Sequence, residues 1–514
     1  DQGVDYFHPE LLPGMAYFIE EIQGHSIAVV SINEEGEISD FSSRCGVSKD
    51  YCIAAPGGSV TVAYPTSADD YGIYTGDTTD PNYNSCVEDN SCYAVAGGTS
   101  FAAPFVTGGL AVMAQHFEGQ LGNTELVARL FATADKNGIY NNSEIYGQGL
   151  MDLAAATAPV GQVSAMLGHN LSGPMTTAAF TSIHLTNPSF GDSISRGINN
   201  ETVIFFDELH APFRRPLAGI ISDYRNQIMN LNGYDETDNY NTKTSITGES
   251  FFQVGLSSYS NHSNELISPY HLLNIKSDND QYFAYFNYEK NTFMSYGINA
   301  GWALGIFQDE FLRSKINLRS KFNNPWMNFT AAGTSIGSIK DVDENFNIAL
   351  TISSGRNKFQ SNEIFGDTNT STLALIELQT NLGIPSFQLG LLKENDSQMG
   401  LRGSGALNGQ GNQLTSFLGI TNSMDAFGGK LFGSTYWGQT ADSKNETGMI
   451  SAINDIRSSS FGFGYLISSV FQKNDLLTFT VDQPIRVESG NLNLEVPVYR
   501  TKKKNVLFNS LDIN

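Results

Sequence analysis

Residues 97–109 read Gly-Gly-Thr-Ser-Phe-Ala-Ala-Pro-Phe-Val-Thr-Gly-Gly, and this stretch decides how the first part of the chain folds. From Phe101 to Phe117 the residues are small and apolar without regular alternation, which predicts a central, buried helix. Pro104 is expected in its first turn, where a missing N–H costs little. Ser100 would then lie at the helix N-terminus, where backbone N–H groups and the helix dipole favour a developing oxyanion. From serine and glycine alone, a serine that only caps a buried helix would be the better interpretation.

The sequence around this stretch predicts an α/β unit over residues 1–160. Residues 26–32 form a short apolar run that ends in a turn-like Asn-Glu-Glu-Gly, as in a buried strand of a parallel sheet. Asn123 and Thr124 are placed to cap a second helix. The apolar stripe of that helix comprises Leu126, Val127, Leu130 and Phe131.

From about residue 250 the hydrophobic period changes to two. Residues 296–307, 345–353 and 461–468 each alternate large apolar residues with small or polar ones. Many such segments with no helix between them predict an all-β antiparallel barrel or sandwich over residues 251–514. Long strands with one aromatic-rich face suit an outer-membrane barrel, and a soluble sandwich with an aromatic core is the alternative. Residues 161–250 are expected to be a linker or irregular extension.

Composition narrows the class of protein. The 514 residues carry 29 Lys and Arg against 53 Asp and Glu, a net charge of −24, which disfavours nucleic-acid binding. No apolar run approaches the roughly 18 residues of a membrane-spanning helix. The chain begins at Asp1 without Met and ends on a stretch that resembles a strand cut short, so we expect a fragment of a longer protein.

The segment from Gly98 to Gly108 resembles the nucleophile motif of the subtilisin-like serine peptidases (family S8), Gly-Thr-Ser-Met-Ala-x-Pro-His-Val-x-Gly. Phe101 replaces Met, and Phe105 replaces a common His that is not part of the catalytic triad. Flanking residues extend the resemblance: 25–32, 38–43, Ala55-Pro56-Gly57 and 146–152.

The resemblance implies that Ser100 is the nucleophile and that its backbone N–H is an oxyanion donor. The residues that support the motif are Gly98, Thr99, Ala102, Pro104 and Gly108. Glycine at 98 lets a substrate backbone approach, while Ala102, Ala103 and Gly108 are expected to let the helix pack tightly.

The catalytic base is not found in the chain. The family order is Asp, His, Ser, and the resemblance covers about residues 10–160, the C-terminal part of such a domain. The catalytic Asp, the His and the oxyanion Asn are therefore expected upstream of Asp1. His8 and His25 lack the family's Gly-Thr-His-Val context and are interpreted as ordinary polar residues.

These expectations define a function and an alternative. The parent protein should be a serine endopeptidase that works through an acyl-enzyme on Ser100, whereas the 514-residue chain alone should be inactive. The alternative is a non-catalytic surface or adhesion protein with a peptidase-like scaffold. The specificity pocket of the family lies largely upstream, so the sequence predicts polypeptide substrates without a preference.

Four cysteines form two close pairs, Cys45/Cys52 and Cys86/Cys92. Neither pair has Cys-x-x-Cys spacing and no His cluster is near, which disfavours zinc. In a secreted-type peptidase we expect disulfides, favoured within each pair with other pairings open, and an oxidising compartment. No metal or cofactor is expected; structural calcium is frequent in the family, but no ligand set for it is visible.

Three weaker resemblances, at residues 44–53, 206–213 and 482–490, are to autotransporters of Gram-negative bacteria. They imply a secreted or cell-surface protein associated with the outer membrane through residues 251–514. One competing motif is rejected: Gly333–Gly337 matches Gly-x-Ser-x-Gly, but the helix that this nucleophile elbow requires does not follow it.

Overall fold

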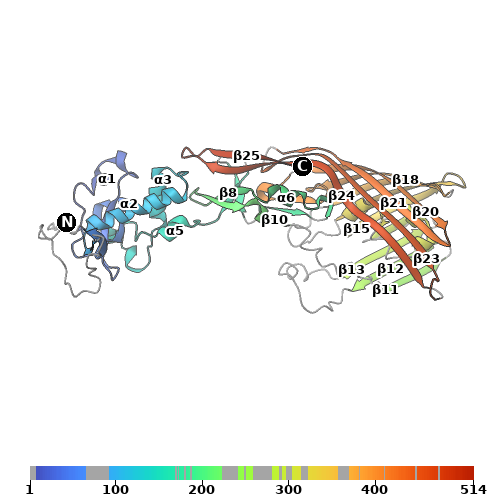
Figure 1. Ribbon diagram of the computed structural model, residues 1–514, viewed down its shortest axis with the longest axis horizontal. Coiled ribbons are helices and arrows are strands. Elements are labelled where there is room, and N and C mark those ends of the chain that lie inside the picture. The colour runs from blue at the N-terminus through green and yellow to red at the C-terminus, as the bar shows by residue number, and fades with distance from the viewer. Residues whose placement is uncertain are drawn as a thin grey trace.

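The computed structural model describes residues 7–64, 92–167, 171, 173–178, 181–185, 188–222, 241–247, 250–258, 280–288, 292–296, 304–313, 322–330, 332–356, 370–380, 383–409, 411–445, 448–472 and 475–514. The molecule is elongated, with the helices of the N-terminal part at one end and a large sheet at the other (Figure 1). Among the described residues, no helix has the length and apolar character that crossing a membrane requires.

The N-terminal part is built on parallel strands, as predicted. Strand β1 (Ala28–Ile32) pairs in parallel with β2 (Cys52–Pro56), and residues 147–151 run along the other side of β2. Two helices, α2 (Thr99–His116) and α3 (Asn123–Thr133), contribute the buried Ala102, Val106, Met113, Leu126 and Leu130 to one core with Ile53. The remaining elements here are α1 (Met15–Phe18), β3 (Val60–Tyr64), β4 (Cys92–Ala96), α4 (Ser143–Tyr146) and α5 (Leu153–Thr157), with β3 and β4 antiparallel.

Residues 161–222 contain regular structure in their described part. Strands β5 (Ser164–Met166), β6 (Met175–Thr177), β8 (Thr202–Phe206) and β9 (Pro212–Pro216) form one small sheet. A second small sheet combines β7 (Ser182–Leu185) and β10 (Ile221–Ser222) with β19 (Leu401–Ser404), and α6 (Ser193–Ile198) lies between β7 and β8 in sequence. Residues 161–222 follow the N-terminal part in sequence, and β7 pairs with β19 from the C-terminal half. This stretch therefore connects the two parts of the molecule.

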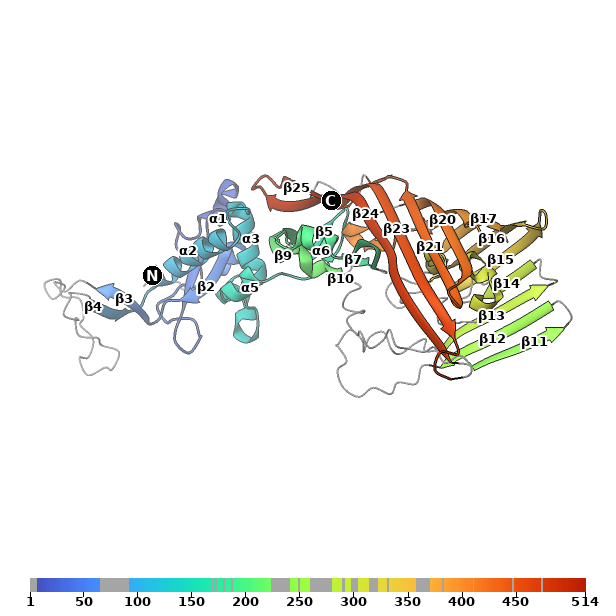
Figure 2. The same ribbon diagram turned by 45° about the vertical axis from the view of Figure 1, so that its right-hand side comes forward.

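The C-terminal part contains a 14-stranded antiparallel sheet. Its strands are β11 (Asn241–Thr247), β12 (Ser250–Ser258), β13 (Asp280–Tyr288), β14 (Thr292–Tyr296), β15 (Ala332–Asp341), β16 (Phe346–Arg356), β17 (Ser371–Thr380), β18 (Ser386–Asn395), β20 (Asn412–Ala426), β21 (Gly429–Thr440), β22 (Ser443–Lys444), β23 (Ile450–Ser468), β24 (Leu476–Arg500) and β25 (Val506–Ile513). The antiparallel all-β prediction is confirmed. These strands form one curved sheet whose strand order ends at β11 and β25 (Figure 2).

One predicted strand is wrong in its described part. Residues 296–307 alternate in sequence, but β14 ends at Tyr296 and residues 305–308 form the 3₁₀ turn η9 (Gly305–Gln308). Gly305 has a φ of +61°, which favours glycine. Its N–H donates to Glu377 Oε1 at 2.8 Å, so this segment turns in against the sheet face instead of continuing as a strand.

Residues 304–313 and 322–330 supply a second layer on the inner face of the sheet. Besides η9 they include α9 (Glu310–Arg313) and η10 (Pro325–Thr330). Gln308 Nε2 donates to Glu377 Oε1 at 2.9 Å, and fully buried Trp326 stacks on Phe417 with ring centroids 4.4 Å apart. These contacts bury one face of β17 and β20.

Part of the sheet has an apolar outer face and buried polar side chains on its inner face. Strand β17 turns Glu377 and Gln379 inward, where both are buried, and turns Ile376 and Leu378 outward, where both are exposed. Strand β18 likewise buries Gln388 and exposes apolar side chains. An open apolar groove crosses the outer face and is lined in part by Ile336, Leu350, Ile352, Ile376, Leu389 and Leu391.

Candidate active site

Ser100 lies in the first turn of α2, and its side chain is exposed. Because a helix has no internal acceptor for its first four N–H groups, the backbone N–H of Ser100 points out of the helix start. No hydrogen bond to Ser100 Oγ is made by the described residues. The arrangement leaves a hydroxyl and a backbone donor side by side at the positive end of the helix dipole.

Gly98 precedes the helix in a backbone conformation that suits glycine. Its φ is +156° and its ψ is +153°, a region that L side chains rarely adopt. A Cβ built at this position would lie 3.5 Å from the nearest atom of Phe101, which is ordinary contact. Backbone strain, and not lack of space, therefore explains the glycine.

A second glycine, Gly57, fixes the start of α2 against the end of β2. Gly98 N–H donates to Gly57 O at 2.8 Å. A Cβ at Gly57 would lie 2.7 Å from Ser31 Oγ and 2.9 Å from Ala102 Cβ, closer than real atoms approach. The Ala-Pro-Gly segment singled out in the sequence thus lets β1, β2 and α2 meet at one point, with Ala102 fully buried as expected.

Below this point lies a buried group of serines. Ser31 Oγ and Ser39 Oγ are 2.9 Å apart, and Ser31 N–H donates to Ser42 Oγ at 3.0 Å. The three side chains are almost fully buried, so they tie residues 38–43 to the carboxyl end of β1. Sequence reasoning found this segment by its resemblance but missed its hydroxyl network.

Pro104 lies elsewhere in the helix than predicted. Because α2 begins at Thr99, Pro104 is the sixth residue of the helix and not part of its first turn. A proline has no N–H, so the carbonyl of Ser100, four residues earlier, lacks its helical partner. The kink-prone position of the proline thus falls beside the candidate nucleophile.

The prediction of a buried central helix holds for one face of α2 only. Ala102, Val106 and Met113 are buried, but Phe105 is 43 % exposed and Val112 is 50 % exposed. These two side chains lie on the face of α2 that turns away from the core shared with β2 and α3, and no described segment covers them.

The same open face carries two residues that were expected to pack tightly. Ala103 is exposed, and a Cβ added at Gly108 would meet no atom within 4 Å. The described structure therefore provides no close packing partner for either residue.

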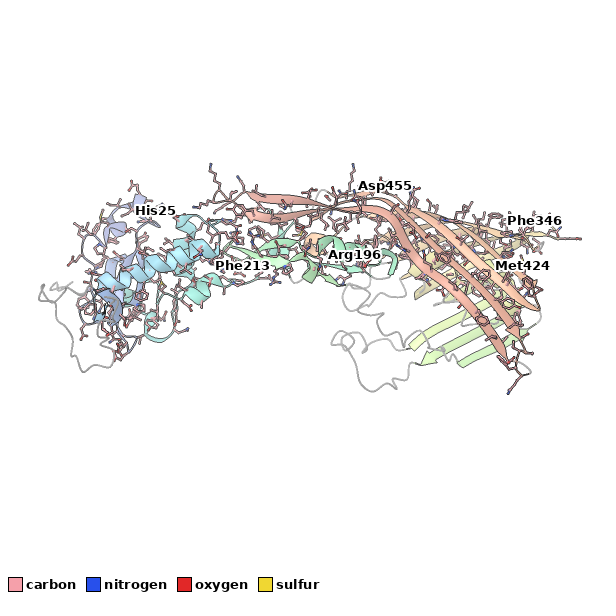
Figure 3. All side chains as sticks on the ribbon, in the orientation of Figure 1. His25, Arg196, Phe213, Phe346, Met424 and Asp455 are labelled. Carbon is pink, nitrogen blue, oxygen red and sulfur yellow. A yellow bond between two sulfur atoms is a disulfide. The ribbon has the colours of Figure 1, made fainter. Side chains whose placement is uncertain are left out.

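No histidine of the described residues hydrogen-bonds to Ser100. His8 is exposed, and its Nδ1 accepts from Val47 N–H at 3.3 Å. His25 is exposed in the turn before β1 (Figure 3). His116 lies in the last turn of α2, at the opposite end from Ser100, against Phe117. The described part of the chain thus places the Ser100 hydroxyl and a backbone N–H together at the helix start, with no described histidine hydrogen-bonded to that hydroxyl.

The disulfide Cys45–Cys52 is confirmed, with Cα atoms 5.7 Å apart at the start of β2. Cys86 lies outside the described residues, and with it the predicted Cys86–Cys92 pair. Within the described ranges, no three His, Cys, Asp or Glu side chains are grouped so that they could hold a metal ion. Ser335 of the rejected elbow motif is buried on β15 and bonds Ser353.

Residues 13–149 match the model of the subtilase family, Peptidase_S8, and the chain therefore carries a subtilase-family peptidase domain. Among curated relatives, the Serotype-specific antigen 1 of Mannheimia haemolytica is 29 % identical over 151 residues, which is 29 % of this chain and 14 % of that protein. The Extracellular serine protease of Serratia marcescens is 28 % identical over 153 residues, 30 % of this chain and 14 % of that protein. The matched segment thus spans about a seventh of either relative.

Two solved structures show similarity over a comparable share of the chain. The prenylagaramide maturation protease PagA is 20 % identical, with a TM-score of 0.19 over 26 % of this chain and 41 % of that one. The self-cleaved protease domain of PatA is 19 % identical, with a TM-score of 0.19 over 26 % and 40 % of the two chains.

Proposed function

We propose that the parent protein of this chain is a serine endopeptidase in which Ser100 is the nucleophile. The observation that carries the proposal is the exposed Ser100 at the start of α2, held there by the Gly57–Gly98 contact. Ser100 Oγ would attack the scissile carbonyl of a polypeptide, and its own N–H would donate to the oxyanion. Water would then release the acyl-enzyme.

The proposed base lies outside the described residues. A catalytic His and Asp, and an Asn as second oxyanion donor, are assigned to sequence upstream of Asp1. A serine without its base is a weak nucleophile at neutral pH. The 514-residue chain by itself should therefore not hydrolyse polypeptides at a useful rate.

The experiment compares casein hydrolysis by the 514-residue chain and by the protein extended with the sequence encoded upstream. We expect hydrolysis only by the extended protein. Ser100→Ala should lower its kcat by about 10⁴-fold or more. Thr107→Ala, which removes a hydroxyl from the exposed face of the same helix, is the matched control and should leave kcat unchanged.

Two results would contradict the proposal. Full activity of the Ser100→Ala variant would show that the nucleophile lies elsewhere. An extended protein that is folded but inactive would favour the alternative, a surface or adhesion protein with a peptidase-like scaffold.

We also propose that the sheet anchors the protein in a bacterial outer membrane. The support is an exposed apolar outer face together with buried polar groups on the inner face: Ile376, Leu389 and Leu391 face outward, while Glu377 and Gln388 face inward. A lipid environment favours apolar outer side chains and tolerates polar inner ones. In phase partitioning with a mild detergent, the chain should enter the detergent phase; a monodisperse chain that stays in the aqueous phase without detergent would contradict the anchor.

A further inference from the structure

The turn between α2 and α3 is the place where three distant parts of the chain meet. We call residues 117–129 the α2–α3 corner. It follows the last turn of α2, and it carries the carboxylates Glu118 and Glu125. The β8–β9 hairpin (202–216) and the β24–β25 hairpin (476–513) both reach it, and Figure 2 shows β25 extending from the sheet toward α3.

The β8–β9 hairpin contacts the corner through a buried ion pair. Arg129 Nη1 donates to Asp207 Oδ2 at 2.6 Å, and the two side chains are 2 % and 0 % exposed. Arg129 also donates to the carbonyls of Ala156 and Ala158, both at 2.6 Å. Its guanidinium lies 5.0 Å from the ring centroid of Phe117. Because every charged group here has a partner, the pair satisfies the condition for burial.

Aromatic and surface contacts around this ion pair complete the contact between the β8–β9 hairpin and the corner. The rings of Phe117 and Phe213 pack edge to face, with centroids 5.8 Å apart, and Figure 3 labels Phe213 where the hairpin meets the N-terminal part. Arg214 Nη2 pairs with Glu118 Oε2 at 2.7 Å on the surface. Exposed ion pairs of this kind contribute little free energy of association. The buried Arg129–Asp207 pair is therefore the main polar contact between the β8–β9 hairpin and the corner.

The β24–β25 hairpin contacts the corner through Arg500, which is completely buried. Its backbone N–H donates to Gln120 Oε1 at 2.8 Å and its Nη1 to Gln120 O at 2.7 Å. Its two Nη atoms also bond the two carboxylate oxygens of Glu125. Glu125 in turn accepts from Gly122 N–H at 2.9 Å and so caps α3. One guanidinium thus connects the hairpin to the first turn of α3.

The sequence of the hairpin turn fits this role. In a chain with net charge −24, residues 500–504 read Arg-Thr-Lys-Lys-Lys. Lys504 Nζ lies 3.6 Å from Glu125 Oε1, whereas Lys503 has no ion-pair partner among the described residues. The basic turn faces the acidic corner. Charge complementarity therefore favours contact between this hairpin and the α2–α3 corner over contact with other parts of the N-terminal part.

We propose that the α2–α3 corner is a docking surface for these two hairpins. We further propose that Arg500 keeps the subtilase part (residues 1–160) bound to the sheet region even after the chain is cut at Gly161. The docked end of α2 is remote from Ser100, since an 18-residue helix is about 27 Å long. Docking therefore leaves the proposed active site open. The proposal does not depend on catalysis by Ser100.

The test cuts the connection and asks whether the two pieces stay together. A site-specific protease sequence is inserted between Gly161 and Gln162 of the full chain, and the protein is cleaved and run on gel filtration in detergent. We expect both fragments to co-elute at micromolar concentration. Arg500→Ala should raise their Kd at least tenfold, because it removes the buried bidentate contact.

Two further variants make the result specific. Arg500→Lys keeps the charge but cannot reproduce the bidentate geometry, so its Kd should lie between those of the other two proteins. Lys503→Ala, in the same turn, is the matched control and should leave Kd unchanged. Separation of the unmodified fragments would overturn the proposal, as would an Arg500→Ala Kd equal to that of the unmodified pair or an equal effect of Lys503→Ala. Circular dichroism of each uncut variant checks that the sheet is intact.

Discussion

Two glycines of the nucleophile motif differ in why glycine is found there: Gly98 has a backbone conformation that only glycine adopts easily, whereas Gly108 has an ordinary helical conformation. Gly98 adopts a φ of +156°, whereas Gly108 is a helical residue with open space around it. A side chain at 98 must therefore force an unfavourable backbone conformation. A side chain at 108 mainly reduces the conformational freedom of the unfolded chain.

We predict that Gly98→Ala lowers the free energy of unfolding by about 1–3 kcal/mol. Gly108→Ala should raise it by about 0.5–1 kcal/mol, because alanine is the better helix former. Urea unfolding followed by circular dichroism measures both changes. A stabilised Gly98→Ala variant, or a Gly108→Ala variant destabilised by more than about 1 kcal/mol, would contradict the local geometry.

Much of the site could be predicted from the sequence, but not its surroundings. The motif predicted a helix N-terminus near Ser100 and the burial of Ala102. It could not predict that the face with Phe105 and Gly108 is open, since exposure depends on which segments cover a helix and not on the helix itself. The position of Pro104 was wrong because helix boundaries are set by backbone bonds such as that from Gly98 N–H to Gly57 O.

At the scale of elements, hydrophobic period predicted the strands well and failed at one place. Residues 345–353 and 461–468 lie almost entirely in β16 and β23, but residues 304–307 fold into the inner layer. An alternating pattern reflects side-chain polarity only. It does not show which distant hydrogen-bond acceptor will bind a segment and turn it out of the strand. Here the acceptor is Glu377, 72 residues from Gly305.

The inner layer should contribute strongly to the stability of the sheet. We predict that Trp326→Ala lowers the free energy of unfolding by about 3–5 kcal/mol, because a large buried ring leaves a cavity. Trp437→Ala is the matched control, since Trp437 lies on the outer face and is 47 % exposed; its effect should be clearly smaller. Guanidinium unfolding of both variants in detergent makes the comparison, and equal effects would contradict the burial of the inner layer.

At the scale of the whole molecule, the N-terminal part and the sheet are joined by contacts that sequence periodicity does not reveal. Arg129 and Asp207 are 78 residues apart, and Glu125 and Arg500 are 375 residues apart. A single sequence read by periodicity contains no signal for such pairs. The basic turn at 500–504 was the available clue, because positive clusters are rare in this acidic chain.

The docking of the second hairpin should weaken in acid. Burial alone would raise the pKa of Glu125, but the Arg500 hydrogen bonds, Gly122 N–H and the nearby positive charges outweigh it and lower that pKa below its ordinary value. A carboxylate with a lowered pKa stabilises the docked state above its ordinary pKa, and this contribution is lost as pH falls through the lowered value.

We therefore predict that the Kd of the cleaved fragments is constant from pH 7 to about pH 5 and rises below about pH 4. Glu125→Gln should bind more weakly at neutral pH and lose most of this acid dependence. Isothermal titration or gel filtration across the pH range checks both statements. A Kd that falls on acidification would contradict the assigned partner of Arg500.

The Glu125–Arg500 contact has a consequence for biosynthesis. A ribosome makes residue 125 long before residue 500, and domains begin to fold as they emerge. Over that interval the corner has no guanidinium to neutralise Glu125 and to bond Gln120. The nascent subtilase part must therefore pass through a stage in which this acidic corner faces solvent or a chaperone, and maturation is complete only when the distant hairpin arrives.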